Sequence, residues 1–259
     1  MRHSVDNIIV PMAGLGLRFK ENNFGTIKPL IKVDHQCILE KSISKLPNSA
    51  NKIIILKNEI HKKYSNLRKL IKKNKFNILL LNKNTLGQAD TCHKAKKLIN
   101  DNEDVFIHSC DYILRFSKKK FIDLKKSCDV IVFTYKLKSR IVKNYCDFAY
   151  CSFDKNKTVN KITEKRTVSD DPANDHMIVG TFWFKKAKDL FMSCEIAKKK
   201  KYYVNKELYI ANNINILIKK NLKVKFLEVD FWINFGDVHD FNSYIYWQNF
   251  FSGTNYLKI

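Results

Sequence analysis

The sequence predicts an α/β fold in which helices cover both faces of a mixed, mostly parallel sheet. Three observations predict it. Up to about residue 135, short apolar runs typical of buried strands alternate with segments whose apolar residues recur at helical spacing. The chain has 259 residues, of which 45% are hydrophobic, which is enough for a large core. No linker rich in Pro, Gly or Ser divides it, so we expect one domain over residues 1–259.

The first part of the chain, to about residue 135, reads as regular strand–helix repeats. Strands are expected at 7–12, 30–33, 52–56, 76–81, 104–107 and 130–133, because each is a short run dominated by apolar residues. Helices are expected at 38–46, through 67–71, at 89–99 and at 116–126, where apolar residues three or four positions apart share a face. This order predicts parallel strands joined by helical crossovers.

The second part, from about residue 136, is less regular. Strands are expected at 148–150, 158–163, 178–184 and 224–229, joined by polar turns. Helices are expected at 186–199, at 207–219 and from His239 onward. We interpret this part as an extension of the same domain that completes the sheet.

The formal net charge is +23, from 48 Lys+Arg against 25 Asp+Glu. Such an excess invites an interpretation as a nucleic-acid binder. Lysine is, however, spread along the whole chain, and no basic motif interleaved with aromatic residues is present. We therefore interpret most lysines as solvated surface and expect no nucleic-acid partner, although the positive field should attract polyphosphates.

Membrane and secreted classes are disfavoured. No run of about 18 apolar residues occurs, so no membrane span or membrane partner is expected. The apolar stretch 8–17 is interrupted by Pro11 and two glycines and meets Arg18, unlike a signal peptide. The seven cysteines form no Cys-x-x-Cys pair, which favours a reducing, cytoplasmic location.

The glycines indicate a phosphate-binding loop after the first strand. Only 7 of 259 residues are Gly, yet Gly14, Gly16 and Gly25 fall in one loop. A loop at the carboxyl end of the first parallel strand can present backbone N–H groups to phosphate. It lacks the third glycine of a dinucleotide-binding fingerprint and the Gly-Lys-Ser/Thr of a Walker loop. Arg18 and Lys28 frame it, as suits a triphosphate attacked at its α-phosphorus while pyrophosphate departs.

Six segments in order resemble the sugar-phosphate nucleotidylyltransferases, the superfamily of glucose-1-phosphate thymidylyltransferase, which includes small-molecule cytidylyltransferases. Together they extend over roughly residues 7 to 245. The segments are Val10 to Phe19 with Lys28 to Val33, Thr85 to Ala89, Ser109 to Asp111, Ile162 to Lys165, Val179 to Phe184, and Trp232 to Asp237. The resemblance implies a Rossmann-like three-layer sandwich, with a nucleotide-binding part to about residue 135 and an acceptor-binding part over 136–259.

The resemblance also implies roles for the nucleotide-side residues. Ala13, Gly14 and Gly16 would bind the nucleotide, and Arg18 would hold the β- and γ-phosphates as a planar donor. Lys28 would neutralise charge at the α-phosphate. Asp111 would hold Mg²⁺, a hard cation that takes oxygen ligands. A helix cap at Ser117 is an alternative role for Asp111, but the residue lies too far from that position.

On the acceptor side, the resemblance assigns Lys165 to the acceptor phosphate and Glu164 to a hydroxyl or amine. Gly180 lies in the glycine-containing strand of that side. An exposed Glu-Lys pair after a strand is the alternative for the first two residues. Gln88 would pair with a base edge, and a Gln at the matching place in thymidylyltransferases favours a pyrimidine nucleotide.

One position departs from the family pattern, because Asn234 stands where members usually have a second metal-binding Asp. Three explanations stay open. The metal is held chiefly by Asp111 and the phosphates, with the Asn234 carbonyl oxygen as a neutral ligand; or Asp237 substitutes; or catalysis is lost.

The sequence thus predicts a Mg²⁺-dependent enzyme that joins a nucleoside triphosphate to a sugar 1-phosphate, releasing pyrophosphate, for capsule or other surface polysaccharide precursors. A CTP-dependent cytidylyltransferase for a non-sugar acceptor, such as phosphocholine or a phosphoamide, is one alternative. A non-catalytic nucleotide-binding subunit is another. The expected partners are the triphosphate and a phosphorylated small molecule, and a homo-oligomer stays open.

Overall fold

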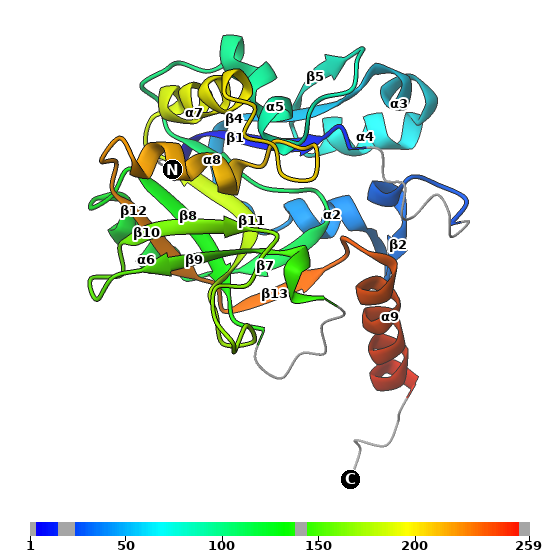
Figure 1. Ribbon diagram of the computed structural model, residues 1–259. Helices are drawn as coiled ribbons and strands as arrows, with labels where there is room; N and C mark the ends of the chain where they lie inside the picture. The colour runs from blue at the N-terminus through cyan, green and yellow to red at the C-terminus, as the bar shows by residue number, and fades with distance from the viewer. Residues whose placement is uncertain (1–3, 15–23, 138–143, 254–259) are drawn as a thin grey trace.

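The computed structural model describes residues 4–14, 24–137 and 144–253 of the chain. Within these residues, a nine-stranded mixed sheet crosses the molecule (Figure 1). Its strands in chain order are β1 (Val5–Met12), β4 (Ser49–Lys57), β5 (Asn77–Leu81), β6 (Val105–Ile107), β8 (Val130–Tyr135), β9 (Ala149–Phe153), β10 (Val159–Glu164), β11 (Met177–Phe184) and β12 (Val224–Glu228). Their spatial order is β10-β9-β11-β6-β1-β4-β5, and β8 pairs with both β11 and β12.

Most strands of this sheet run in one direction. Strand β1 is parallel to β4 and β6, and β4 is parallel to β5. Strand β11 is antiparallel to β6, β8 and β9, whereas β12 is parallel to β8. Only β10 and β11 therefore oppose the other strands of the described sheet. The prediction of a mixed, mostly parallel sheet is confirmed.

Successive residues of the parallel strands face two separate hydrophobic cores, because side chains alternate across a strand. In β4, Ile53 and Ile55 enter one core, while Ile54 and Leu56 enter the other. The first core is covered by α5 (Gln88–His93), α7 (Ala187–Lys199) and α8 (Ile210–Ile218). The second is covered by α2 (Ile38–Ile43), α4 (Ser65–Lys73) and α6 (Lys118–Lys125). These layers confirm the expected three-layer sandwich (Figure 1).

Three helices differ from their predicted ranges. The basic helix after β4 is broken into α3 (Asn58–Lys63) and α4, because Tyr64 between them has an extended backbone with φ −111° and ψ 94°. The helix expected at 89–99 tightens after His93 into the 3₁₀ segment η2 (Lys94–Leu98). The helix expected at 207–219 begins only at Ile210, because Val204 and Glu207 bond to each other in a turn before it.

A short ribbon outside the main sheet was not predicted. Strand β7 (Tyr112–Arg115) pairs antiparallel with β13 (Phe231–Asn234), which brings a late segment onto the loop after β6. Two further short features precede it in the chain, namely η1 (Lys28–Leu30) and the hairpin of β2 (Lys32–Val33) with β3 (Gln36–Cys37). A 3₁₀ turn, η3 (Tyr145–Asp147), leads into β9.

The last helix, α9 (Val238–Gly253), starts beside this ribbon and stands out from the body of the molecule (Figure 1). Its first turns pack into a third core that contains Ile31, Ile38, Phe235 and Phe241. In the described part of the chain, no helix has the length and apolar character needed to cross a bilayer.

Candidate active site

The candidate site lies at the carboxyl ends of β1 and β6. Because these strands are parallel neighbours, the loops that follow them emerge at the same edge of the sheet. Ala13, which is buried, and Gly14, which is exposed, follow β1, and Asp111 lies in the loop between β6 and β7. The predicted site residues Gly16 and Arg18 lie outside the described residues.

Lys28 and Asp111 meet in this edge region. The Lys28 Nζ donates to Asp111 Oδ2 at 2.6 Å and to the Gly236 carbonyl oxygen at 3.0 Å. The lysine side chain is largely buried and the carboxylate is about twice as exposed, at 13% and 29%. The structure thus joins three segments that are far apart in the sequence, around a partly open ion pair.

The ribbon of β7 and β13 fixes the backbone around Asp111. Asn234 is the register partner of Tyr112, and the Phe235 N–H donates to the Asp111 carbonyl oxygen at 2.8 Å. These bonds hold Asp111 against Gly236. Asp111 has no hydrogen bond to the helix start at Ser117, whose own hydroxyl accepts from the Lys120 N–H, so the capping alternative for Asp111 is wrong.

The side chain of Asn234 is engaged by its own loop. Its Oδ1 accepts from the Gly236 N–H at 2.8 Å, and its Nδ2 donates to Asp240 Oδ2 at 2.6 Å. A Cβ on Gly236 would lie 2.6 Å from the same Oδ1, so the close turn depends on glycine here. The carbonyl oxygen that would serve a metal already holds the turn.

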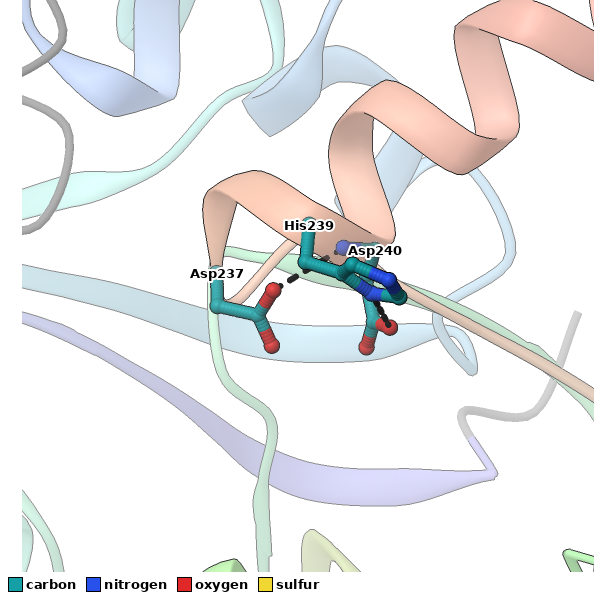
Figure 2. Close-up of side chains that lie close together, drawn as sticks. All are labelled: Asp237, His239 and Asp240. Carbon is teal, nitrogen blue, oxygen red and sulfur yellow. Dashed lines mark hydrogen bonds and ion pairs between the residues drawn. The ribbon is translucent and has the colours of Figure 1, made fainter. Parts of the chain in front are cut away.

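Asp237, the other candidate second ligand, caps α9. Its Oδ1 accepts from the Asp240 N–H at 2.9 Å, which is a helix N-cap bond. Figure 2 shows Asp237, His239 and Asp240 gathered at this helix start, where one ligand atom of each lies within 4.8 Å of the others. His239 Nδ1 is 3.7 Å from Asp240 Oδ1. The cluster sits one residue beyond Gly236 and hence beside the Lys28–Asp111 pair.

The residues present fit a divalent cation held mainly by Asp111. Its carboxylate is 29% exposed and only its Oδ2 is paired with the Lys28 ammonium, so Oδ1 has no ion-pair partner among the described residues. Mg²⁺ is commonly bound through one or two carboxylates together with substrate phosphates, so one protein carboxylate suffices. Asn234 adds no charge and is already hydrogen-bonded.

Gln88, Ser109 and Gly180 converge beside the loop that carries Asp111. The Gln88 Nε2 donates to Ser109 Oγ at 3.2 Å. Gly180 has φ +86°, and a Cβ there would lie 3.5 Å from the Tyr112 hydroxyl and 3.9 Å from Ser109 Oγ. Gln88, which is predicted to contact the base, and Gly180, which is predicted for the acceptor side, therefore both lie next to Ser109.

A buried polar network lies beneath this serine. His108 Nδ1 is 3.0 Å from Thr181 Oγ1, which in turn is 2.6 Å from the Tyr112 hydroxyl. Ser42 on α2 contacts His108 Nε2 at 3.1 Å and donates to the Ser109 carbonyl oxygen at 2.8 Å. Burial lowers the pKa of His108 to about 4, so the ring is neutral near pH 7. The network supports the site and was missed in the sequence, because its members come from three separate segments.

Glu164 and Lys165 lie at the end of β10, in a second region. Burial raises the pKa of Glu164 to about 7; Lys165 opposes this shift, and Glu207 adds to it. Glu164 Oε2 has no hydrogen-bond partner among the described residues. Lys165 has φ +58°, and its Nζ donates to the Asp147 carbonyl oxygen and lies 5.7 Å from the Tyr209 ring centroid. No hydrogen bond or ion pair between described residues joins this pair to Lys28 or Asp111.

A backbone contact links the two regions. Leu208 N–H donates to the Leu86 carbonyl oxygen at 2.6 Å, and the Ala89 N–H donates to the Leu208 carbonyl oxygen at 3.0 Å. Gly87 between them has φ +115°, and a Cβ there would lie 2.8 Å from that oxygen. Glu207 precedes Leu208 in the chain, and its negative charge helps to raise the pKa of Glu164. The Gln88 loop and the acceptor region are therefore connected through one segment, residues 207–208.

Asp90 is a further residue that the sequence did not reveal. Its carboxylate is buried on α5, where it accepts from the Leu86 N–H at 3.0 Å and from Lys198 Nζ at 3.1 Å. Burial alone would raise its pKa, but these bonds and Lys94 keep the pKa of Asp90 below its ordinary value. This aspartate ties the loop before Gln88 to α5 and α7. An Asp that follows the first apolar residue of a predicted helix matches no sequence motif that would indicate such contacts.

Comparison with known proteins gives one family match. The model of the family described as nucleotidyl transferase matches residues 9–249. No curated protein matches the chain.

Solved structures share the fold at low sequence identity. The nucleoside-diphosphate-sugar pyrophosphorylase from Vibrio cholerae RC9 aligns with a TM-score of 0.74 and 19% identity, over 92% of this chain and 99% of that one. The inositol-1-phosphate CTP transferase from T. maritima aligns with a TM-score of 0.68 and 14% identity, over 95% of each chain. HddC from Yersinia pseudotuberculosis aligns with a TM-score of 0.64 and 17% identity, over 94% of this chain and 99% of that one.

These structural likenesses show the fold, and the family match extends across nearly all of the described sheet. The fold agrees with that match. The chain therefore belongs to the nucleotidyl transferase family and is a nucleotidyltransferase.

Proposed function

We propose that this nucleotidyltransferase joins a nucleoside triphosphate, with a pyrimidine base favoured, to a sugar 1-phosphate in a Mg²⁺-dependent reaction that releases pyrophosphate. The product would be an activated precursor for a surface polysaccharide. One observation carries the proposal: the Lys28 ammonium lies between the Asp111 carboxylate and the Gly236 carbonyl, at the edge where the loops after β1 and β6 emerge. The likeness to the nucleoside-diphosphate-sugar pyrophosphorylase of V. cholerae supports a sugar nucleotide as product.

The bond changes follow from this chemistry. A phosphate oxygen of the acceptor attacks the α-phosphorus of the triphosphate, and a new P–O bond forms. The bond from that phosphorus to the bridging oxygen breaks, and pyrophosphate leaves with the electron pair. Charge grows on the phosphate oxygens, so catalysis rests on positioning and on charge neutralisation.

Each nucleotide-side residue has a defined task in this scheme. Lys28 Nζ turns from Asp111 toward an oxygen of the α-phosphate, a short movement of a flexible stem. Arg18 would hold the β- and γ-phosphates, and the N–H groups of Ala13, Gly14 and Gly16 would hold the nucleotide. Mg²⁺ on Asp111, when bound, supplies further charge neutralisation on the triphosphate. Gln88 would meet the base from the start of α5.

The acceptor would bind near the end of β10 and near Gly180 of β11. The Oε2 of Glu164 has no hydrogen-bond partner among the described residues, so it suits a hydrogen bond from a hydroxyl or amine of the bound substrate. Lys165 would take the acceptor phosphate, and Gly180 leaves space beside Ser109. We accordingly assign residues to about 135 to the nucleotide and 136–259 to the acceptor, within one domain.

Two other functions have a specific observation in their favour. The name of the T. maritima structure, and the acidic pair of Glu164 with Glu207, favour a CTP-dependent enzyme with a non-sugar acceptor phosphate. The engaged Asn234 oxygen favours a nucleotide-binding subunit without catalysis.

The deciding experiment is a matrix of four NTPs and dTTP against sugar 1-phosphates, phosphocholine and inositol 1-phosphate, with pyrophosphate release as the readout. We expect release with a pyrimidine nucleotide, Mg²⁺ and a sugar 1-phosphate. Asp111→Asn should abolish that release, because the cation loses its carboxylate, whereas Asp123→Asn on the exposed face of α6 should not. Release only with phosphocholine or inositol 1-phosphate selects the cytidylyltransferase, and no release across the matrix selects the subunit.

A further inference from the structure

Helix α9 carries an exposed aromatic cluster on its outer half. Tyr246 is 63% exposed and Trp247 is 53% exposed, and Phe250 and Phe251 are 49% and 62% exposed. Trp247 forms ring contacts with the other three, at centroid distances of 5.3 to 6.0 Å. Large aromatic side chains gathered at one exposed place are typical of a surface that contacts another molecule.

The cluster occupies the side of α9 opposite to the side that packs on the body. Residues four positions apart share a helix face, so Phe241 and Ile245 lie together, and both pack into the third core. The pairs 246 with 250 and 247 with 251 lie together on the other side. A helix with apolar residues on both sides is typical of a fully buried helix, yet Tyr246 and Trp247 are more than half exposed.

The helix surface is also free of charge, in a chain that is strongly basic. Residues 241–257 contain no Asp, Glu, Lys or Arg, although the chain has 48 Lys+Arg. Depletion of charged residues with enrichment of Tyr, Trp and Phe is the composition of protein–protein interface cores. Two copies of a chain with net charge +23 repel each other over most of their surfaces, and this uncharged projecting helix is a place where they can meet.

We propose that the outer face of α9, formed by Tyr246, Trp247, Phe250 and Phe251, is the interface at which two copies of this chain pair. A two-fold axis would place α9 against α9, so that each aromatic cluster covers the other. Four half-exposed aromatic side chains on each copy would bury roughly 900 Å² in total, near the roughly 1,000 Å² of a specific but weak interface. The pairing is therefore expected to be reversible, in the micromolar range.

An anionic membrane fits this surface less well. Helices that lie on membranes carry Lys and Arg on their polar face, which attract acidic headgroups. The polar positions of α9 after Asp240 are Asn, Ser and Gln. A second copy of the chain is therefore the occupant that the charge pattern favours.

Trp247 allows a direct test, because the other two tryptophans, Trp183 and Trp232, are buried. We expect the mass in sedimentation equilibrium to rise from 30.5 kDa toward twice that value as the protein is concentrated from about 1 to about 200 μM. Acrylamide quenching of tryptophan fluorescence should fall over the same range. Added NaCl should increase the dimer fraction, because it screens the repulsion between the two basic copies.

Trp247→Glu and, separately, Tyr246→Glu should each shift dimerisation to concentrations at least tenfold higher, since a carboxylate would be buried against its own copy. Ile122→Glu is the matched control, because Ile122 is 48% exposed on α6, and it should dimerise as the wild type does. Circular dichroism melting verifies that each variant is folded. A monomer at every concentration overturns the proposal, as do α9 variants that dimerise normally. Flotation of a monomer with phosphatidylserine vesicles, lost in Trp247→Glu, would assign the face to a membrane instead.

Discussion

At the scale of single residues, Asp111 and Lys28 neutralise each other while the triphosphate is absent. Their 2.6 Å contact pairs an ammonium with a carboxylate in the proposed phosphate site, and each supplies the charge that the other would lack. An arriving triphosphate would compete for Lys28 and leave Asp111 available to a cation. Binding of nucleotide and of cation are expected to favour each other for this reason.

Glu164 leads to a pH prediction. Its pKa is raised by burial from 4.5 to about 7, so the folded protein binds this proton more tightly than the unfolded chain does. The tighter proton binding stabilises the folded protein fully below about pH 4.5, and this stabilisation is lost as pH rises through 7. Glu164→Gln cannot ionise, so the variant should escape this decline and gain roughly 3 kcal/mol relative to wild type between pH 4.5 and 8.

Urea unfolding at a series of pH values measures this difference. Glu59→Gln, at an exposed glutamate on α3, is the control and should follow the wild-type profile. Parallel wild-type and Glu164→Gln profiles would mean that the carboxyl is solvated in solution.

The sequence located several of these residues but not their partners. Lys28, Asp111 and Gln88 lie in segments whose resemblance to the family marks them in order along the chain. The bond from Asn234 to Asp240, and the pair of bonds on Asp90, depend on how a turn and two helices meet in space. Pattern and motif carry no information on such contacts.

At the scale of elements, the regular strands and helices of the first part were predictable because their apolar periods are strong. The β7–β13 ribbon was not, since each strand has four residues, and the partners lie more than a hundred positions apart in the sequence. The break at Tyr64 was also missed, because the apolar positions before and after it continue one helical period. Local pattern thus predicted the layers but not the connection that completes the site.

The contact between the Gln88 loop and the segment before α8 can be tested with glycines. Gly87→Ala places a Cβ 2.8 Å from the Leu208 carbonyl oxygen at a backbone φ of +115°, so the loop must move away or strain. We expect a loss of about 1–3 kcal/mol in the free energy of unfolding. Denaturant titration measures it.

Gly14→Ala serves as the comparison, because a Cβ on Gly14 has no heavy atom within 4 Å. Its stability should stay within about 0.5 kcal/mol of wild type. Equal stability of the two variants would contradict the tight backbone contact at Leu208.

At the scale of the whole molecule, the sheet direction and the charge balance act together. The parallel strands place the loops after β1 and β6 at one edge, and the net charge of +23 gives the whole molecule a positive field that attracts polyphosphates. From the sequence, we interpret most of this charge as solvated surface rather than as a nucleic-acid site. Its consequence for a triphosphate depends on the site geometry, which composition alone does not contain.

Ionic strength therefore offers a prediction that rests on the proposed reaction. Raising NaCl from about 50 to about 500 mM should raise the KM for the triphosphate several-fold and change kcat less than about twofold, because screening weakens long-range attraction more than contacts in the site. Steady-state pyrophosphate release measures both. Sucrose at matched osmolality is the control. A KM for the triphosphate that does not change with salt would show that the lysines of the surface do not attract the substrate.

The bond from Lys28 to Gly236 also bears on how the protein is made. Its two ends are separated by 208 positions, and the ribbon that fixes Asp111 needs β13, the last strand described. A nascent chain emerges from the ribosome N-terminus first, so β1 and β6 can pair while Gly236 is still unmade. Capacity to bind a triphosphate would therefore arise only after β13 and Gly236 have been made.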